Sequence, residues 1–214
     1  MTFTLPQAVI FDWDNTLVGS WGAIDFAINK TFEHFGKPRW TPEQVRLNCR
    51  RSARDTFPEW FGIERWKEAY ELFYEHFNAI RAEGATPTSG AVDLLRWLKK
   101  ADIACFVVSN KRGPDLRKEV VTLRWGDFFV KLVGSGDAAQ DKPARDPIDL
   151  ALLAANLTPG PDIWFVGDTD VDVVCARNAD CTPVFVGDQA EAAKLSVEMA
   201  FDDCLKLYQW LEAN

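Results

Sequence analysis

The sequence has no excess of basic residues, and none of its apolar runs approaches the roughly 18 residues needed to span a membrane. Its 214 residues carry a net charge of −8 at pH 7, which argues against a nucleic-acid-binding module and against adhesion to an anionic membrane. Residues 1–7 have neither a cationic start nor a long apolar stretch. We therefore expect no secretory signal there and a cytoplasmic location.

Cysteine and histidine are also scarce. The five cysteines are odd in number and show no C-x-x-C spacing, so we expect reduced, mostly buried thiols instead of disulfides or a zinc site. The two histidines, His34 and His76, have no paired ligand spacing, and we expect both to be structural or to face solvent.

Apolar residues make up 47% of the chain, enough for a sizeable core of one or two domains. A first apolar strand at 7–11 is followed by a long region with helical periodicity, and from residue 87 onward helix and strand patterns alternate. This order predicts an α/β fold, a Rossmann-like parallel-sheet core with an α-helical cap inserted after the first strand. We expect residues 1–18 and 86–214 to form the core and residues 19–85 to form the cap. The further expected strands are 103–108, 130–134, 163–166, 183–186 and 199–201, and the expected core helices are 90–100, 114–124, 146–155, 171–179 and 203–212.

Four short segments carry the polar residues that suggest chemistry. They are Asp12-Trp13-Asp14-Asn15-Thr16, Ser109-Asn110, Lys142-Pro143 and Gly167-Asp168-Thr169-Asp170-Val171-Asp172. Three of the four follow an expected buried strand, and open parallel sheets place their ligand sites at the carboxyl ends of strands. Carboxylates that face a lysine and hydroxyl groups suit a hard cation together with an anionic substrate. The pattern therefore indicates metal-assisted phosphoryl chemistry.

The acidic residues of these segments suggest distinct roles. An ionised Asp12 could attack phosphorus, and Asp14 is placed to protonate the leaving oxygen and later to deprotonate water. Asp168 and Asp172 are candidate ligands of Mg²⁺, with Asp170 as the solvated member of the run. The structural alternatives are that the Asp12/Asp14 pair forms a turn and that Asp168 caps a helix.

Hydroxyl, amide and lysine groups complete the candidate site. Thr16, Ser109 and the amides around Asn15 and Asn110 could donate to phosphate oxygens. Lys142 could neutralise the phosphoryl group and the carboxylates, although Lys111 is a competitor because it follows Ser109 closely.

Together, the four segments resemble the four motifs of the haloacid dehalogenase (HAD) superfamily in order and spacing, and the insert resembles its small C1-type cap. The nearest branch resembles the phosphoglycolate phosphatase-like hydrolases. The resemblance implies an aspartyl-phosphate mechanism with Mg²⁺ as cofactor. It implies that Asp12 is the nucleophile and a metal ligand, and that Asp14 is the acid/base and binds the metal through its backbone carbonyl. It further implies that Asp168 and Asp172 bind the metal. The residues implied at the phosphate are Thr16, Ser109, Asn110 and Lys142.

Three positions depart from the family pattern. Asn15 and Asp180 stand where glycine is common, and both residue types tolerate the left-handed backbone conformation. Gly19 replaces a common aspartate where the chain passes into the cap, which makes cap closure harder to predict.

The cap region concentrates arginines between residues 46 and 54. One interpretation is a solvated helix end. The other is that Arg50, Arg51 and Arg54 face the active site and bind a second anionic group of the substrate, which would favour a small phosphorylated acid such as phosphoglycolate.

The function predicted from these features is Mg²⁺-dependent hydrolysis of a small phosphomonoester, possibly phosphoglycolate. A sugar phosphomutase, a 2-haloacid dehalogenase and a non-catalytic regulatory protein are alternatives, and Asp14 with the metal candidates argues against the dehalogenase. The expected partner is a small phosphorylated metabolite, and both a monomer and a homodimer stay open.

Overall fold

The computed structural model describes residues 5–81 and 84–214. The first four residues of the expected core, and of the segment expected to lack a secretory signal, lie outside these ranges, as do residues 82 and 83 of the expected cap. Among the described helices, none is both long enough and apolar enough to cross a membrane.

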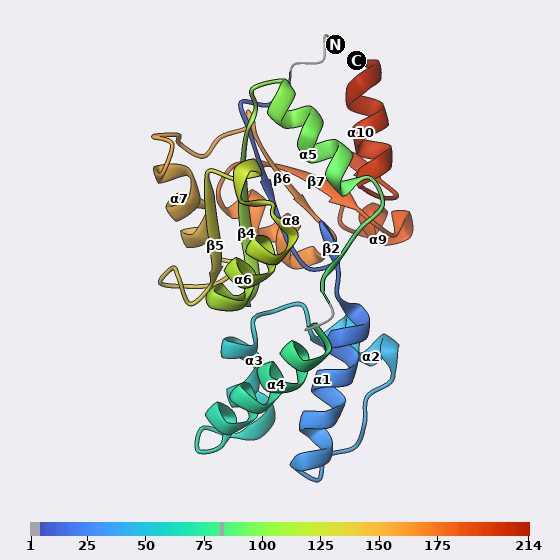
Figure 1. The fold of residues 1–214 in the computed structure, drawn as a ribbon, viewed down its shortest axis with the longest axis vertical. Helices are drawn as coiled ribbons and strands as arrows, with labels where there is room; N and C mark the ends of the chain where they lie inside the picture. The colour runs from blue at the N-terminus through green and yellow to red at the C-terminus, as the bar shows by residue number, and fades with distance from the viewer. Residues whose placement is uncertain (1–4, 82–83) are drawn as a thin grey trace.

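The larger of the two parts of the molecule is built around a six-stranded parallel sheet and is called the sheet layer below (Figure 1). The strands run in the order β5-β4-β1-β6-β7-β8, so β1 lies between β4 and β6. The order runs in opposite directions from β1, which makes the carboxyl end of β1 a switch point of the kind that holds ligands in such sheets. The predicted fold class is confirmed. The strands are β1 (Ala8–Phe11), β4 (Ala104–Arg112), β5 (Lys131–Ser135), β6 (Ile163–Gly167), β7 (Thr182–Val186) and β8 (Met199–Phe201).

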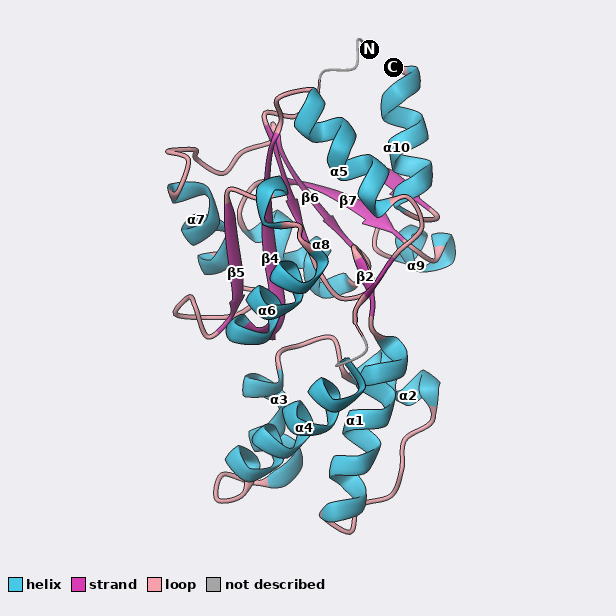
Figure 2. Cartoon of the chain, in the orientation of Figure 1, coloured by secondary structure: helices cyan, strands magenta, loops and turns pink. Residues whose placement is uncertain are grey.

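Helices cover both faces of this sheet (Figure 2). Successive side chains of a strand point to opposite faces. Val9 and Phe11 therefore pack in one cluster with α5, α6 and α10, whereas Ala8 and Ile10 pack in another with α7 and α8. The helices are α5 (Ala91–Lys100), α6 (Gly113–Leu123), α7 (Asp146–Leu153), α8 (Asp170–Asn178), α9 (Gln189–Lys194) and α10 (Cys204–Ala213), with a short 3₁₀ turn at Gly126–Phe128.

Four helices follow the first strand and lie to one side of the sheet layer (Figure 1). They share an aromatic core in which Phe32, Phe57 and Phe73 are buried. Thr41 begins one helix with the capping box that its sequence predicts: its hydroxyl accepts from the backbone N–H of Gln44, and the Gln44 side chain accepts from the backbone N–H of Thr41. The four helices are α1 (Trp21–His34), α2 (Pro42–Asn48), α3 (Ala53–Phe61) and α4 (Trp66–Arg81).

The chain leaves and re-enters the sheet layer through a pair of short antiparallel strands. These are β2 (Val18–Gly19) and β3 (Thr86–Pro87), with Val18 opposite Pro87. Their position supports the proposed division into a core and a cap at residues 19–85.

Some elements differ from the sequence-based expectation. The helix α9, whose first turn is capped by the Asp188 side chain, has no counterpart among the expected elements because its six residues carry little apolar periodicity. Strand β4 continues to Arg112 instead of ending at Val108, and its pairing with β5 shifts register between these residues. This extension carries Ser109 and the two residues that follow it along the edge of the cavity.

Candidate active site

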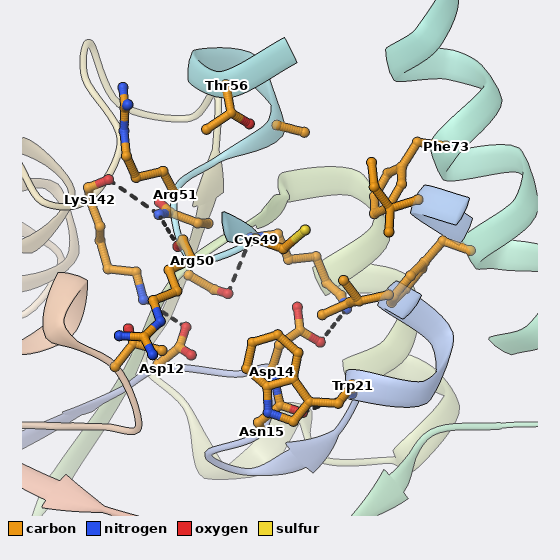
Figure 3. A pocket seen from close by; sticks show the side chains of 18 of the residues that line it. Asp12, Asp14, Asn15, Trp21, Cys49, Arg50, Arg51, Thr56, Phe73 and Lys142 are labelled. Carbon is orange, nitrogen blue, oxygen red and sulfur yellow. Dashed lines mark hydrogen bonds and ion pairs between the residues drawn. The ribbon is translucent and has the colours of Figure 1, made fainter. Parts of the chain in front are cut away.

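The cavity between the sheet and the inserted helices is lined by polar residues from all four sequence segments (Figure 3). Its volume is about 100 Å³. Asp12 and Asp14 reach it from the end of β1, Asp168 comes from the end of β6, and Ser109 lies within β4. The convergence expected from the strand ends is therefore present.

Lys142 joins two of the carboxylates. Its Nζ donates to Oδ1 of Asp12 at 2.7 Å and to Oδ1 of Asp172 at 2.6 Å, and its side chain is buried. Burial alone would lower the pKa of Lys142, but the two carboxylates hold it above its ordinary value, so the ammonium stays charged. Burial raises the pKa of Asp12 to about 6, and Asp172 adds to this shift while Lys142 opposes it.

Asp12, Asp168 and Asp172 form an acidic cluster. One carboxylate oxygen from each lies within 4.8 Å of the others. Burial, followed by the charges of Asp12 and Asp172, raises the pKa of Asp168 well above its ordinary value. Three hard oxygen donors this close together fit a divalent cation such as Mg²⁺, which prefers oxygen ligands.

Asp172 is fixed by the first turn of α8. Its Oδ2 accepts from the backbone N–H of Thr169 at 3.0 Å and from the Thr169 hydroxyl at 2.7 Å. Its neighbour Gly167 needs to be glycine, because a Cβ there would lie 2.4 Å from the Cβ of Asp172. The end of β6 and the start of α8 are thus packed around this carboxylate.

Asp14 lies apart from that cluster and faces the start of the inserted helices. Its Oδ1 accepts from Nζ of Lys111 at 2.6 Å and from the Ser20 hydroxyl at 2.5 Å. Asn15 beside it adopts a left-handed φ of 66°, and its side-chain oxygen accepts from the backbone N–H groups of Ser20 and Trp21. This left-handed conformation agrees with the expectation that asparagine can stand here in place of the glycine that is common in the family.

A buried network behind Asp14 was not foreseen from the sequence. Glu119 of α6 accepts from Nε1 of Trp13 at 2.7 Å and from Nε of Arg81 at 3.0 Å, and it lies 3.3 Å from Nζ of Lys111. The sequence suggests Lys111 only as a competitor of Lys142. The structure gives each lysine a different aspartate.

The candidate phosphate-binding groups are partly engaged with other residues. The Thr16 hydroxyl donates to Asp168 at 3.1 Å, and the Ser109 hydroxyl accepts from the backbone N–H of Lys111. The Asn110 amide donates to the carbonyl oxygens of Lys142 and Arg50, and its own Oδ1 is buried without a partner. Ser109 and Asn110 line the cavity, whereas Thr16 does not. Their roles at phosphate stay predictions.

The cap arginines pair with acidic residues. Arg50 donates to Asp170 at 2.9 Å and lies 2.5 Å from Glu191. Arg54 lies 3.3 Å from the buried Asp141.

The third arginine, Arg51, is half-exposed and lies 3.5 Å from Glu59 of its own helical layer. Arg50 and Arg51 line the cavity, but Arg54 is not among the residues that do. Asp170, expected to be solvated, is about half-exposed and bound to Arg50.

The parallel sheet places the acidic cluster and the buried lysine at its switch point, where enzymes of this architecture bind their ligands. Residues 9–186 match the model of the haloacid dehalogenase-like hydrolases, and the chain belongs to this family. It is an enzyme, a phosphatase of the family, in agreement with the curated proteins to which it is similar.

One such protein is named phosphoglycolate phosphatase, from Chromobacterium violaceum; it is 26% identical, with 96% of each chain covered. Another is phosphoglycolate phosphatase 1 of Pseudomonas aeruginosa, which is 28% identical over 82% of this chain and 67% of that protein. Among solved structures, a HAD-superfamily hydrolase from Ehrlichia chaffeensis is 26% identical with a TM-score of 0.68, covering 99% of this chain and 98% of that one. CbbY from Rhodobacter sphaeroides, solved with phosphate, shares the fold at 20% identity and a TM-score of 0.81, covering 95% of this chain and 96% of that one.

Proposed function

We propose that this protein is a Mg²⁺-dependent phosphatase that hydrolyses a small phosphomonoester through an aspartyl-phosphate intermediate. The observation that carries the proposal is the position of Lys142, whose ammonium joins Asp12 to Asp172 beside Asp168. A buried cation next to an acidic cluster suits an anionic substrate and a metal ion together.

In the proposed first step, an oxygen of Asp12 attacks phosphorus. The new bond joins that oxygen to phosphorus, the ester P–O bond breaks, and Asp14 gives its proton to the departing alkoxide oxygen. In the second step, Asp14 takes a proton from water, the water oxygen attacks phosphorus, and inorganic phosphate leaves with Asp12 regenerated. Lys142 orients Asp12 and stabilises the charge on the phosphoryl oxygens.

Asp12, Asp168, Asp172 and the backbone carbonyl of Asp14 would hold the Mg²⁺ ion. When bound, the ion neutralises the negative charge that builds up between the acidic cluster and the phosphoryl group. Ser109, Asn110 and Thr16 are proposed to bind the phosphoryl oxygens, which requires the Thr16 hydroxyl to leave Asp168.

The substrate class that we propose is a small phosphorylated metabolite met in the cytoplasm. Phosphoglycolate is the reference candidate, because the relatives' names contain it. Recognition of its carboxylate by Arg50, Arg51 or Arg54 stays a prediction, and for Arg50 it requires release of Asp170 and Glu191.

The test is release of inorganic phosphate from a panel of phosphomonoesters with Mg²⁺, comparing the wild-type protein with Asp12→Asn. We expect turnover of at least one substrate by the wild type and none by the variant, whose amide cannot act as the nucleophile. Circular dichroism checks that the variant is folded. Equal activity of the folded variant and the wild type contradicts the proposal.

A further inference from the structure

Beyond the phosphoryl site, the cavity has a second wall that is built by the inserted helices and is apolar. It contains Ile24, Ile28, Phe57, Trp60, Phe73 and Phe77. These side chains come from α1, α3 and α4, and Figure 3 shows Phe73 on the side of the cavity away from Asp12. If Asp12 is the nucleophile, this wall faces the organic part of the substrate.

The basic side chains along the cavity are already neutralised by carboxylates. Lys142 lies between Asp12 and Asp172, and Lys111 lies between Asp14 and Glu119. Arg50 has two acidic partners from the sheet layer, Asp170 and Glu191.

The remaining basic side chain of the lining, Arg51, contacts Glu59 and is half-exposed. A second anionic group on the substrate would therefore have to displace a carboxylate from Arg50 or Arg51, or else lose its water and meet aromatic rings. Burial of an ion without a partner is strongly unfavourable.

The cavity has room for a short organic group beside the phosphoryl group. One buried water requires about 10–15 Å³ of such volume, so about 100 Å³ accommodates on the order of ten water-sized groups. A phosphoryl group fills part of that space. A short leaving group fits the remainder.

We propose that the apolar wall of Ile24, Ile28, Phe57 and Phe73 binds the leaving group, and that the preferred substrates are short phosphomonoesters whose leaving group is uncharged and apolar. This inference rests on the proposed phosphatase function and narrows its substrate class. It disfavours phosphoglycolate, although relatives carry that name.

A matched pair of substrates tests the inference. Phosphoglycolate and isobutyl phosphate have the same number of non-hydrogen atoms and the same branching, but one ends in a carboxylate and the other in two methyl groups. We expect kcat/KM to be at least about tenfold higher for isobutyl phosphate, because each methyl or methylene group buried against the wall contributes about fourfold in binding.

The outcomes separate the two proposals. An equal or higher kcat/KM for phosphoglycolate overturns the apolar-wall inference and leaves the phosphatase function standing. Failure to release phosphate from either ester or from any member of the wider panel overturns the phosphatase function, and the inference falls with it.

Two wall variants and one control test whether the preference arises at the apolar wall. Phe73→Leu removes ring surface from the wall, and we expect it to lower the ratio of kcat/KM for isobutyl phosphate to that for phosphoglycolate by several-fold. Phe61→Leu is the matched control, since Phe61 is equally buried at 9% exposure within the same aromatic core but does not line the cavity. Ile24→Val provides a milder change should Phe73→Leu fail to fold. A ratio that stays at the wild-type value in the folded wall variants overturns the inference.

Discussion

The ammonium group of Lys111 donates a hydrogen bond of 2.6 Å to Oδ1 of Asp14, and its side chain is only 2% exposed. The same nitrogen lies 3.3 Å from Glu119 and 4.3 Å from the centre of the Phe77 ring. A buried cation with two acidic partners and an aromatic face has little freedom to move. Lys111 therefore fixes the position of the proposed acid/base at the boundary between the sheet layer and the inserted helices.

Replacement of Lys111 by Met should impair catalysis through Asp14. The variant leaves Asp14 and Glu119 without their shared cation, and we expect kcat to fall by about 10²-fold, the size of a typical acid/base contribution. Steady-state kinetics with the best substrate measures the loss. Lys118→Met on the exposed side of the same region is the control and should keep wild-type kcat. Wild-type kcat in a folded Lys111→Met protein would show that Asp14 needs no such support.

The Asp14→Asn variant should accumulate phosphorylated enzyme. Asparagine can neither protonate the leaving oxygen nor activate water, so both steps slow, and with an activated ester the second step slows more. Acid quenching after reaction with p-nitrophenyl phosphate, followed by intact-mass measurement, detects the added phosphoryl group. The matched control is Asp12→Asn, which should never acquire it. Unchanged steady-state turnover in Asp14→Asn would exclude the acid/base role.

Activity should require Mg²⁺ absolutely, and the binding of Mg²⁺ should weaken in acid. The raised pKa of Asp12, about 6, means that protons compete with Mg²⁺ for the cluster below that pH. We expect the apparent Kd for Mg²⁺ to rise as the pH falls through 6, by at least about tenfold per pH unit well below 6, because the pKa of Asp168 is raised as well. Isothermal titration calorimetry at several pH values measures this Kd.

Calcium should inhibit, since its looser coordination misplaces the attacking carboxylate. Full activity after exhaustive chelation would refute the requirement.

Gly167→Ala should destabilise the protein. The new methyl group would overlap the Asp172 side chain, and we expect the free energy of unfolding to fall by about 1–3 kcal/mol, as is usual for overpacking. Gly160→Ala is the control, because no heavy atom lies within 4 Å of a Cβ at that position. Urea denaturation compares the two. Equal stability would mean that the turn after β6 relaxes freely around Asp172.

The sequence predicts what depends on local pattern. Asp12 and Asp168 each follow a buried apolar strand, so their convergence required only the rule that parallel strands share a carboxyl edge. The capping box at Thr41 is likewise local. The position of Lys142 beside both aspartates agrees with the role it was expected to have, although that role is still a prediction.

Contacts between distant residues were not predictable in the same way. Trp13 and Glu119 are 106 residues apart, and Arg81 and Glu119 are 38 apart, with no motif or periodicity linking them. The arginines of the 46–54 segment were recognised as a cluster. Their acidic partners Asp141 and Glu191 depend on how the inserted helices rest against the sheet layer, which local sequence does not encode.

The pairing of Val18 with Pro87 has a consequence for how such an enzyme can change. The chain enters the four helices from β2 and leaves them into β3, and these two strands are paired. The insert is therefore one continuous segment whose two ends lie side by side. An insert of another length or composition can be accommodated between those two points without moving the strands that carry Asp12 and Asp168. Under the proposed function, the insert would set the substrate preference and the sheet would carry the phosphoryl chemistry, so that selection could change one stretch of sequence without the other.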